Sequence, residues 1–265
     1  MGTLRILLPL SIAALAAAQS GPVVTSAASP QIGVTSDSLA SVFASNISTL
    51  TEIADGPPWP TSLGDMTTVF FTDSANKQQN AQILFISPSQ MNIYLPAGFA
   101  PGPGTLSFPT TGLPPGVGTA ALRNVPVTLQ KVAPALFSAS GTGSGVAAAT
   151  AVRITLPTQI QSPVPVFTCE TAGACQPAGI DPGVDAPVYL SFYGTGIRGA
   201  SSLANVTVTI GNVTVQPLYA GPQRQTPGLD QVNVQLPLSL HGAGTVNVTV
   251  TVDGVMSNAV QVDIL

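Results

Sequence analysis

The sequence predicts an all-β protein built from two similar β-sandwiches in tandem. Three observations support this prediction: apolar residues alternate as in strands, segments of the chain repeat, and the composition suits turns. Charged residues make up only 7 % of the 265 residues and hydrophobic residues 45 %, with 26 glycines and 25 prolines. Such a chain has too few charges to cover the outer faces of helices, and it suits short strands joined by many turns.

Alternation with a period of two is clearest near the end of the chain. In residues 244–252 every even-numbered position from Val246 onward is valine, and the odd-numbered positions are threonine or asparagine. Residues 206–210 and 213–215 alternate in the same way, and Gly211 and Asn212 between them are typical of a tight hairpin turn. Because each such strand has one apolar face, two sheets must stack to bury both faces.

An internal repeat divides the chain into two copies. Four blocks occur twice in the same order, with insertions only between them. The pairs are SVFASNI (41–47) with SFYGTGI (191–197), LF and SP (84–88) with LY and GP (218–222), QMNIYLP (90–96) with QVNVQLP (231–237), and GPGTL (102–106) with GAGTV (242–246). The repeat length predicts two immunoglobulin-like sandwiches, over residues 25–131 and 183–265.

The segment between the copies, residues 132–182, is too apolar for a free linker. We expect it to form an inserted β-hairpin that packs against the second copy. Its tip contains Cys169 and Cys175, the only two cysteines. In an oxidising compartment this pair predicts a small disulfide loop, because a metal site needs more ligands and a redox pair is usually spaced C-x-x-C.

The N-terminus resembles a signal peptide. Arg5 precedes an apolar run over residues 6–18, which ends in three alanines before Gln19. The alternative is a membrane anchor, but the run is shorter than the roughly 20 residues needed to span a bilayer. We therefore expect residues 1–18 to be removed after about Ala18, and the mature chain, without a membrane span, to be secreted, periplasmic or at the cell surface.

Several blocks of the chain resemble the uncharacterised Solibacter-type C-terminal domain family of exported acidobacterial proteins. The matching segments are SLASVF (38–43), LFISPSQMNIYLP (84–96), APALF (133–137), GTGSGVAA (141–148), VYLSFYGTGI (188–197), LYAGP (218–222), GLDQVNVQLP (228–237) and Ser257-Asn258. The resemblance covers most of the chain from about residue 30. It implies repeats similar to the sandwiches of the transcription-factor-type immunoglobulin family (IPT/TIG-like), and it implies no particular activity.

The charge pattern argues against a nucleic-acid partner. The formal net charge is −4, and the seven lysines and arginines are scattered along the chain. No stripe of basic residues is available to neutralise phosphates or anionic lipids.

No group of residues in the sequence indicates catalysis. His241 is the only histidine, it lies in turn-like sequence, and no serine has the context of an activated nucleophile. The two glutamates, Glu52 and Glu170, lie in loop-like sequence and do not form a glycosidase pair. Asp181 and Asp185 are interpreted as turn residues, with calcium binding as the alternative. We therefore predict a non-enzymatic protein with no metal and no cofactor.

The repeated glutamine–asparagine pairs have two interpretations. Gln90 and Asn92 in the first copy, like Gln231 and Asn233 in the second, supply amides that hydrogen-bond to sugars, or they fix neighbouring loops by bonding to their backbone. Their presence at the same place in both copies favours the structural role. Similarly, the glycines at 194 and 196 are interpreted as a bend rather than a phosphate loop, because no helix follows them.

Two aromatic residues are weak candidates for a binding surface. Trp59 lies between prolines and is interpreted as a plug for the end of the first sandwich, with a platform for a sugar ring as the alternative. Tyr219 is the second candidate. The sequence thus predicts a secreted structural or interaction module whose partner is an extracellular protein or a glycan. The alternative is a carbohydrate-binding or adhesion protein of the cell exterior.

Overall fold

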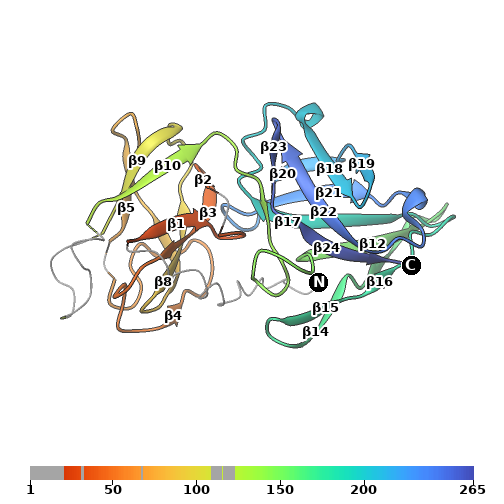
Figure 1. Ribbon diagram of the computed structural model, residues 1–265, viewed down its shortest axis with the longest axis horizontal. Coiled ribbons are helices and arrows are strands. Elements are labelled where there is room, and N and C mark those ends of the chain that lie inside the picture. Colours follow the sequence, from red (N-terminus) through yellow and green to blue (C-terminus); the bar gives the residue numbers. More distant parts are fainter. Residues whose placement is uncertain (1–20, 31–32, 67, 109–114, 116–122) are drawn as a thin grey trace.

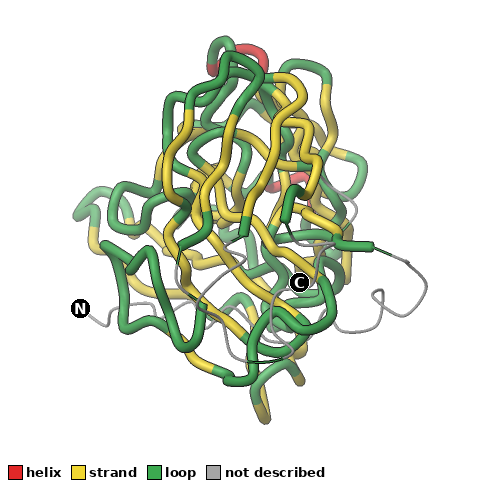
Figure 2. Tube along the Cα trace, turned by 90° about the vertical axis from the view of Figure 1, so that its left-hand side faces the viewer, coloured by secondary structure: helices red, strands yellow, loops and turns green. Residues whose placement is uncertain are grey.

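The computed structural model describes residues 21–30, 33–66, 68–108, 115 and 123–265, and these consist almost entirely of strands and loops (Figure 1, Figure 2). The helical elements within these ranges are two single turns, η3 (Leu203–Asn205) and η4 (Leu238–Leu240). The all-β prediction is confirmed. The predicted signal peptide, residues 1–18, lies outside the described residues. No helix in the described ranges has the length and hydropathy to cross a membrane.

The first sandwich has two five-stranded sheets. One has the order β1 (Val23–Ser26), β3 (Ser38–Phe43), β8 (Gln90–Leu95), β7 (Gln82–Ile86), β4 (Glu52–Ile53). The other has the order β2 (Val34–Thr35), β10 (Val125–Gln130), β9 (Gly102–Ser107), β5 (Phe70–Thr72), β6 (Gln78–Asn80). Their facing side chains, among them Val42, Phe71, Ile93 and Leu106, form one buried core.

The second sandwich has two six-stranded sheets. One has the order β13 (Ile160–Val164), β12 (Ala149–Thr155), β17 (Val188–Thr195), β21 (Asp230–Gln235), β20 (Tyr219–Pro222), with β11 (Ala135–Leu136) also paired to β17. The other has the order β16 (Gly179–Ile180), β24 (Val260–Ile264), β22 (Gly244–Val252), β18 (Val206–Ile210), β19 (Val213–Val215), with β23 (Val255–Met256) paired to β22.

The predicted alternation builds the second core. The valines of β22 from Val248 to Val252 are fully buried, whereas the threonines between them are half-exposed. The predicted hairpin is present as β18 and β19, which pair on either side of Gly211 and Asn212. Gly211 has a φ of +59°, a conformation that glycine adopts without strain.

The two sandwiches have the same topology. The order β1-β3-β8-β7 matches β12-β17-β21-β20, and β2-β10-β9-β5-β6 matches β16-β24-β22-β18-β19. Corresponding strands follow one another along the chain in the same sequence. The match extends to the sense of pairing, since β2 pairs parallel with β10 and β16 pairs parallel with β24. The sequence repeat therefore corresponds to a repeat of the fold.

The segment expected to lie between the copies belongs largely to the second sandwich. Strands β11, β12, β13 and β16 all fall within residues 132–182 and are part of its sheets. Only β14 (Phe167–Thr171) and β15 (Ala174–Pro177) form a separate two-stranded hairpin. The second sandwich thus begins at about residue 132 and not, as predicted, at residue 183. The inserted hairpin consists only of β14 and β15, which contain the disulfide.

Candidate functional site

An apolar junction joins the two sandwiches, which lie side by side along the long axis of the molecule (Figure 1). A buried cluster crosses it. From the first sandwich and its loops come Leu39, Trp59 and Leu84, and from the second Phe137, Tyr193 and Leu229.

Trp59 lies in this junction and is only 8 % exposed. Its ring centroid lies 6.2 Å from that of Tyr94. The interpretation of Trp59 as an exposed platform for a sugar ring does not fit this burial. The favoured interpretation, a plug of the first sandwich, is closer to the observed position.

The position of Trp59 leads to a spectroscopic prediction. Because Trp59 is the only tryptophan, fluorescence excited selectively in tryptophan, and not in the four tyrosines, should report this residue alone. We expect emission blue-shifted from that of the urea-unfolded chain and weak quenching by iodide. Emission and quenching equal to those of the unfolded chain would contradict the burial of Trp59 at the junction.

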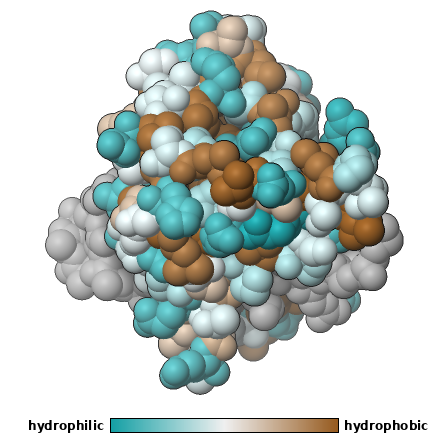
Figure 3. All heavy atoms as spheres, turned by 90° about the vertical axis from the view of Figure 1, so that its right-hand side faces the viewer, coloured by the Kyte–Doolittle hydropathy of each residue, from teal (hydrophilic) through white to brown (hydrophobic). Residues whose placement is uncertain are grey.

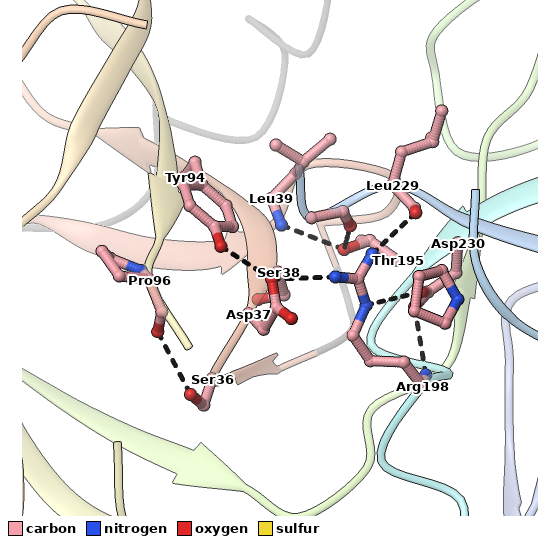
Figure 4. Close-up of polar contacts among 12 residues, drawn as sticks. Ser36, Asp37, Ser38, Leu39, Tyr94, Pro96, Thr195, Arg198, Leu229 and Asp230 are labelled. Atoms are coloured by element: carbon pink, nitrogen blue, oxygen red, sulfur yellow. Dashed lines mark hydrogen bonds and ion pairs between the residues drawn. The ribbon is translucent and has the colours of Figure 1, made fainter. Parts of the chain in front are cut away.

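A polar network also crosses the junction (Figure 4). The guanidinium of Arg198 lies between two carboxylates, with Nε 2.6 Å from Asp230 Oδ1 and Nη1 2.8 Å from Asp37 Oδ1. Its Nη2 donates to the carbonyl oxygen of Leu229 at 2.6 Å. Tyr94 donates its hydroxyl proton to Asp37 Oδ1 at 2.8 Å. Arg198 and Asp230 belong to the second sandwich and Asp37 and Tyr94 to the first, so Arg198 connects the two.

Burial shifts the pKa values of two groups in this network. Asp230 is completely buried, and burial raises the pKa of its carboxyl group although the charge of Arg198 acts in the opposite direction. Burial and the hydrogen bond to Asp37 likewise raise the pKa of the Tyr94 phenol. Tyr94 therefore stays a proton donor to Asp37 at neutral pH.

A second buried link runs through the hydroxyl of Thr195. It accepts a hydrogen bond from the backbone nitrogen of Leu39 at 2.9 Å and donates to the carbonyl oxygen of Gly228 at 2.7 Å. A Cβ atom on Gly228 would lie 3.0 Å from the backbone of Ser38, so glycine allows the close approach here. Backbone and side chain thus both tie the sandwiches together.

Glycines of β17 and the following loop make room for the chain segment that connects the sandwiches. A Cβ atom on Gly194, Gly196 or Gly199 would collide with carbonyl oxygens of residues 131–135. The sequence predicted a bend at Gly194 and Gly196. Gly194 lies instead inside β17, paired with Leu136, and only Gly196, with a φ of +74°, leaves the strand conformation.

Sequence reasoning missed the ion pairs of the junction. Asp37 and Arg198 lie far apart in sequence, and no local pattern indicates that they meet. One signal was present: Asp230 is in phase with Val232 and Val234, both completely buried. A carboxylate on the apolar face of a strand requires a buried partner, and few basic residues are available to supply one.

The repeated amide pairs have the same internal bonding in the two copies. Gln90 Nε2 donates to Asn92 Oδ1 at 2.9 Å, and Gln231 Nε2 donates to Asn233 Oδ1 at 2.7 Å. In the first copy Ser41 of the neighbouring strand also donates to Asn92 at 2.8 Å. These amides therefore bond to each other and to a neighbouring strand. The structural role predicted from the sequence had them bond to the backbone of a loop instead.

The two amide pairs differ in exposure. Gln90 and Asn92 are 6 % and 5 % exposed, whereas Gln231 and Asn233 are only half-buried. Tyr219 lies directly opposite Asn233 on the adjacent strand and is also half-exposed. The structure therefore brings together Tyr219, Gln231 and Asn233, three of the candidates from the sequence, on the outer face of the second sandwich.

The predicted disulfide is present. Cys169 and Cys175 are directly opposite each other in the hairpin β14–β15 and form a bond with sulfurs 2.01 Å apart. Most residues of this hairpin are exposed. The disulfide thus closes a projecting element that contributes little to either core.

Several carboxylates hold loops. Asp65 accepts hydrogen bonds from Ser48 and Thr49, and Asp253 accepts from the backbone nitrogen and the hydroxyl of Ser201. Asp73 accepts from the backbone nitrogens of Ala75 (2.9 Å), Lys77 (2.8 Å) and Ala100 (2.7 Å). The hydrogen bond from Ala100, followed by those from Lys77 and Ala75, holds the pKa of Asp73 below its usual range.

This lowered pKa predicts a pH-dependent effect of Asp73→Asn. The ionised form of Asp73 is favoured by folding, so its contribution is present above the pKa of the unfolded state and is lost as pH falls through the folded pKa. We expect the substitution to lower the thermal midpoint at about pH 7 and to have a smaller effect at about pH 2.5. Thermal unfolding of Asp55→Asn, at an exposed position, is the control. Equal shifts at both pH values would contradict the role of the charge.

The remaining acid–base candidates lie apart. His241 is exposed at the end of η4, and Glu52 and Glu170 are exposed on β4 and β14. Asp181 accepts from the backbone nitrogen of Gly183 at 2.9 Å, the geometry of a turn. Within the described ranges no three metal-ligating side chains lie together.

A hollow of about 660 Å³ on the first sandwich is lined by Phe70, Phe108 and Arg123 together with hydroxyl and amide side chains. At the end of the second sandwich that faces away from the first, brown and teal atoms are interspersed, so this side shows no continuous apolar patch (Figure 3).

Comparison of the chain with protein-family models gives no match, and comparison with curated proteins gives none. The class is therefore defined by the fold alone: an all-β protein of two stacked-sheet sandwiches with one disulfide. The family resemblance found in the sequence stays a prediction.

Proposed function

We propose that this protein is an exported, non-enzymatic interaction module made of two immunoglobulin-like sandwiches. The observation that carries the proposal is the junction, where buried apolar side chains and the ion pairs of Arg198 join the two repeats into one unit. The strand order supports the immunoglobulin-like assignment. Strands β1, β3, β8 and β7 correspond to A, B, E and D of an immunoglobulin domain, and β5, β9 and β10 correspond to C, F and G.

The use of the carboxylates supports a non-enzymatic role. Asp65, Asp73, Asp230 and Asp253 each accept hydrogen bonds from backbone or side-chain groups that position loops or the junction. A general acid or base must instead reach a proton of the substrate. These groups are committed to structure.

The disulfide supports export, because such bonds persist in oxidising compartments. The predicted signal peptide and the resemblance to exported proteins point the same way. The module would then act in the periplasm, at the cell surface or outside the cell, where its partner is an extracellular protein or a glycan.

Expression of the full chain in a Gram-negative bacterium tests the proposal. We expect exported protein whose N-terminus is close to Gln19 and whose intact mass corresponds to one disulfide. We also expect no turnover of chromogenic ester, peptide or glycoside substrates. Retention of the leader in the exported protein, or hydrolysis that disappears in His241→Ala, would overturn the proposal.

A further inference from the structure

On the outer face of the second sandwich, polar side chains are exposed whose equivalents in the first sandwich are buried. Ser41, Gln90 and Asn92 of the first copy correspond to Ser191, Gln231 and Asn233 of the second, in the same strand register. In the first copy all three are less than 9 % exposed. In the second they are half-exposed, so the same set of hydrogen-bonding groups is presented to solvent.

Tyr219 provides a preset aromatic surface beside these groups. A Cβ atom on Gly221 would lie 3.2 Å from the Tyr219 hydroxyl oxygen and 3.4 Å from Cζ, so the ring lies flat along its own strand over this glycine. Its hydroxyl donates to the carbonyl oxygen of Pro222 at 2.6 Å, which fixes the ring. An aromatic ring ordered before binding costs little conformational entropy when a ligand stacks on it.

The amides flank this ring. Tyr219 is directly opposite Asn233, and Gly221 is directly opposite Gln231. Asn233 Oδ1 accepts from Gln231 Nε2. Gln231 Oε1, an acceptor, and Asn233 Nδ2, a donor, form no hydrogen bond to the described residues and are available to a ligand. The hydroxyl of Ser191 lies 3.4 Å from Gln231 Nε2 and completes the polar set.

The side chains that β12, β17, β21 and β20 direct to this outer face are all uncharged. The side chains on this face alternate with core residues, and those at least partly exposed are Thr150, Val152, Ile154, Tyr189, Ser191, Gln231, Asn233, Gln235 and Tyr219. Tyr193, on the same face, is covered by the junction, and Gly221 is covered as well. A phosphorylated or acidic ligand would find no cation among these side chains, and the cation nearest to Tyr219 along the chain is Arg224, in the loop after β20. A neutral ligand rich in hydroxyls, with C–H faces that stack on an aromatic ring, matches the donors, acceptors and apolar surface present.

From this arrangement we propose that the outer face around Tyr219 binds a neutral saccharide. Tyr219 stacks on the sugar ring, and Gln231, Asn233 and Ser191 exchange hydrogen bonds with its hydroxyls. The inference rests on the proposed function, since it names the class of ligand that the interaction module takes. It also places the sugar contact at Tyr219, whereas Trp59 supports the junction.

Binding of neutral hexasaccharides of glucose, xylose, mannose and N-acetylglucosamine to the mature chain, measured by calorimetry and by amide chemical shifts, tests the proposal. Polygalacturonate serves as the charged comparison. We expect at least one neutral hexasaccharide to bind, with shifts centred on β20 and β21. Tyr219→Ala should weaken this binding at least tenfold, and Tyr219→Phe, which keeps the ring, should weaken it less. Gln231→Leu, which keeps the side-chain volume, is expected to weaken it several-fold.

Arg123→Ala, in the hollow on the first sandwich, is the matched control and should bind as the wild type does. Circular dichroism and thermal midpoints of all variants establish that they are folded. Absence of binding by all neutral hexasaccharides, or binding lost in Arg123→Ala but kept in folded Tyr219→Ala, would overturn the proposal. These results would leave the export and the lack of hydrolysis unaffected, because those are measured separately.

Discussion

Replacement of Arg198 by methionine is expected to lower the free energy of unfolding by about 3–5 kcal/mol. Methionine retains much of the apolar stem but removes the guanidinium that pairs with Asp230 and Asp37. Asp230 is then left buried without a counter-ion, and this loss of a partner is far more costly than the net value of the ion pair itself. Urea unfolding monitored through Trp59 measures the change.

The exposed Arg224→Met is the control, and we expect it to change the free energy of unfolding by less than about 0.5 kcal/mol. The destabilisation of Arg198→Met should also depend on pH. Without Arg198 the folded-state pKa of Asp230 rises further, and a carboxyl group with a raised folded pKa loses stability as pH rises above its unfolded pKa. The difference from the wild type should therefore be smaller at about pH 4 than at about pH 7. A loss below about 1 kcal/mol at neutral pH would show that Asp230 is not buried as described.

The fold of each sandwich could be predicted largely from the sequence because its signals are local. Val248, Val250 and Val252 alternate with polar residues and are buried as expected, and Gly211-Asn212 forms the predicted turn. The repeated QxNxxLP block corresponds to β8 and β21, which occupy equivalent positions. Period-two patterns and turn residues act over a few residues, and a single sequence contains this information in full.

The start of the second sandwich could not be predicted in the same way. Its strand β12 corresponds to β1 in the fold, but ATAVRIT and VVTS have no shared pattern. The hairpin β14–β15 is inserted before the next equivalent strand, β16, and separates it from β12. A repeat search therefore finds the second copy only from β17 onward, where the sequences are alike.

The candidate site was predicted in part. Tyr219, Gln231 and Asn233 were singled out individually, but their meeting depends on the pairing of β20 with β21 in one particular register. Trp59 was given two interpretations, a plug and an exposed platform, because a proline-rich loop has no periodicity from which burial can be derived. Whether such a residue faces solvent depends on a neighbouring domain, which is information that its own segment does not contain.

Replacement of Gly196 by alanine is expected to destabilise the protein by about 2–5 kcal/mol, the sum of a left-handed backbone cost of about 1–2 kcal/mol and a steric cost of about 1–3 kcal/mol. Gly196 has a φ of +74°, and its added Cβ would collide with the carbonyl oxygen of Ala133. The colliding atom is backbone, which yields less easily than a side chain. The backbone nitrogen of Ala133 also donates to the carbonyl oxygen of Gly196 at 3.0 Å, so relief of the collision would stretch this bond. Urea unfolding provides the measurement.

Gly242→Ala separates the two contributions to this cost. Gly242 has nearly the same φ, +77°, but no heavy atom lies within 4 Å of the position of its Cβ. We expect this control to lose only the backbone cost, about 1–2 kcal/mol. The excess loss in Gly196→Ala then measures how tightly the connecting segment is held against the second sandwich. Equal losses in the two variants would mean that this segment moves away freely, and that the junction depends on Arg198 and the apolar cluster instead.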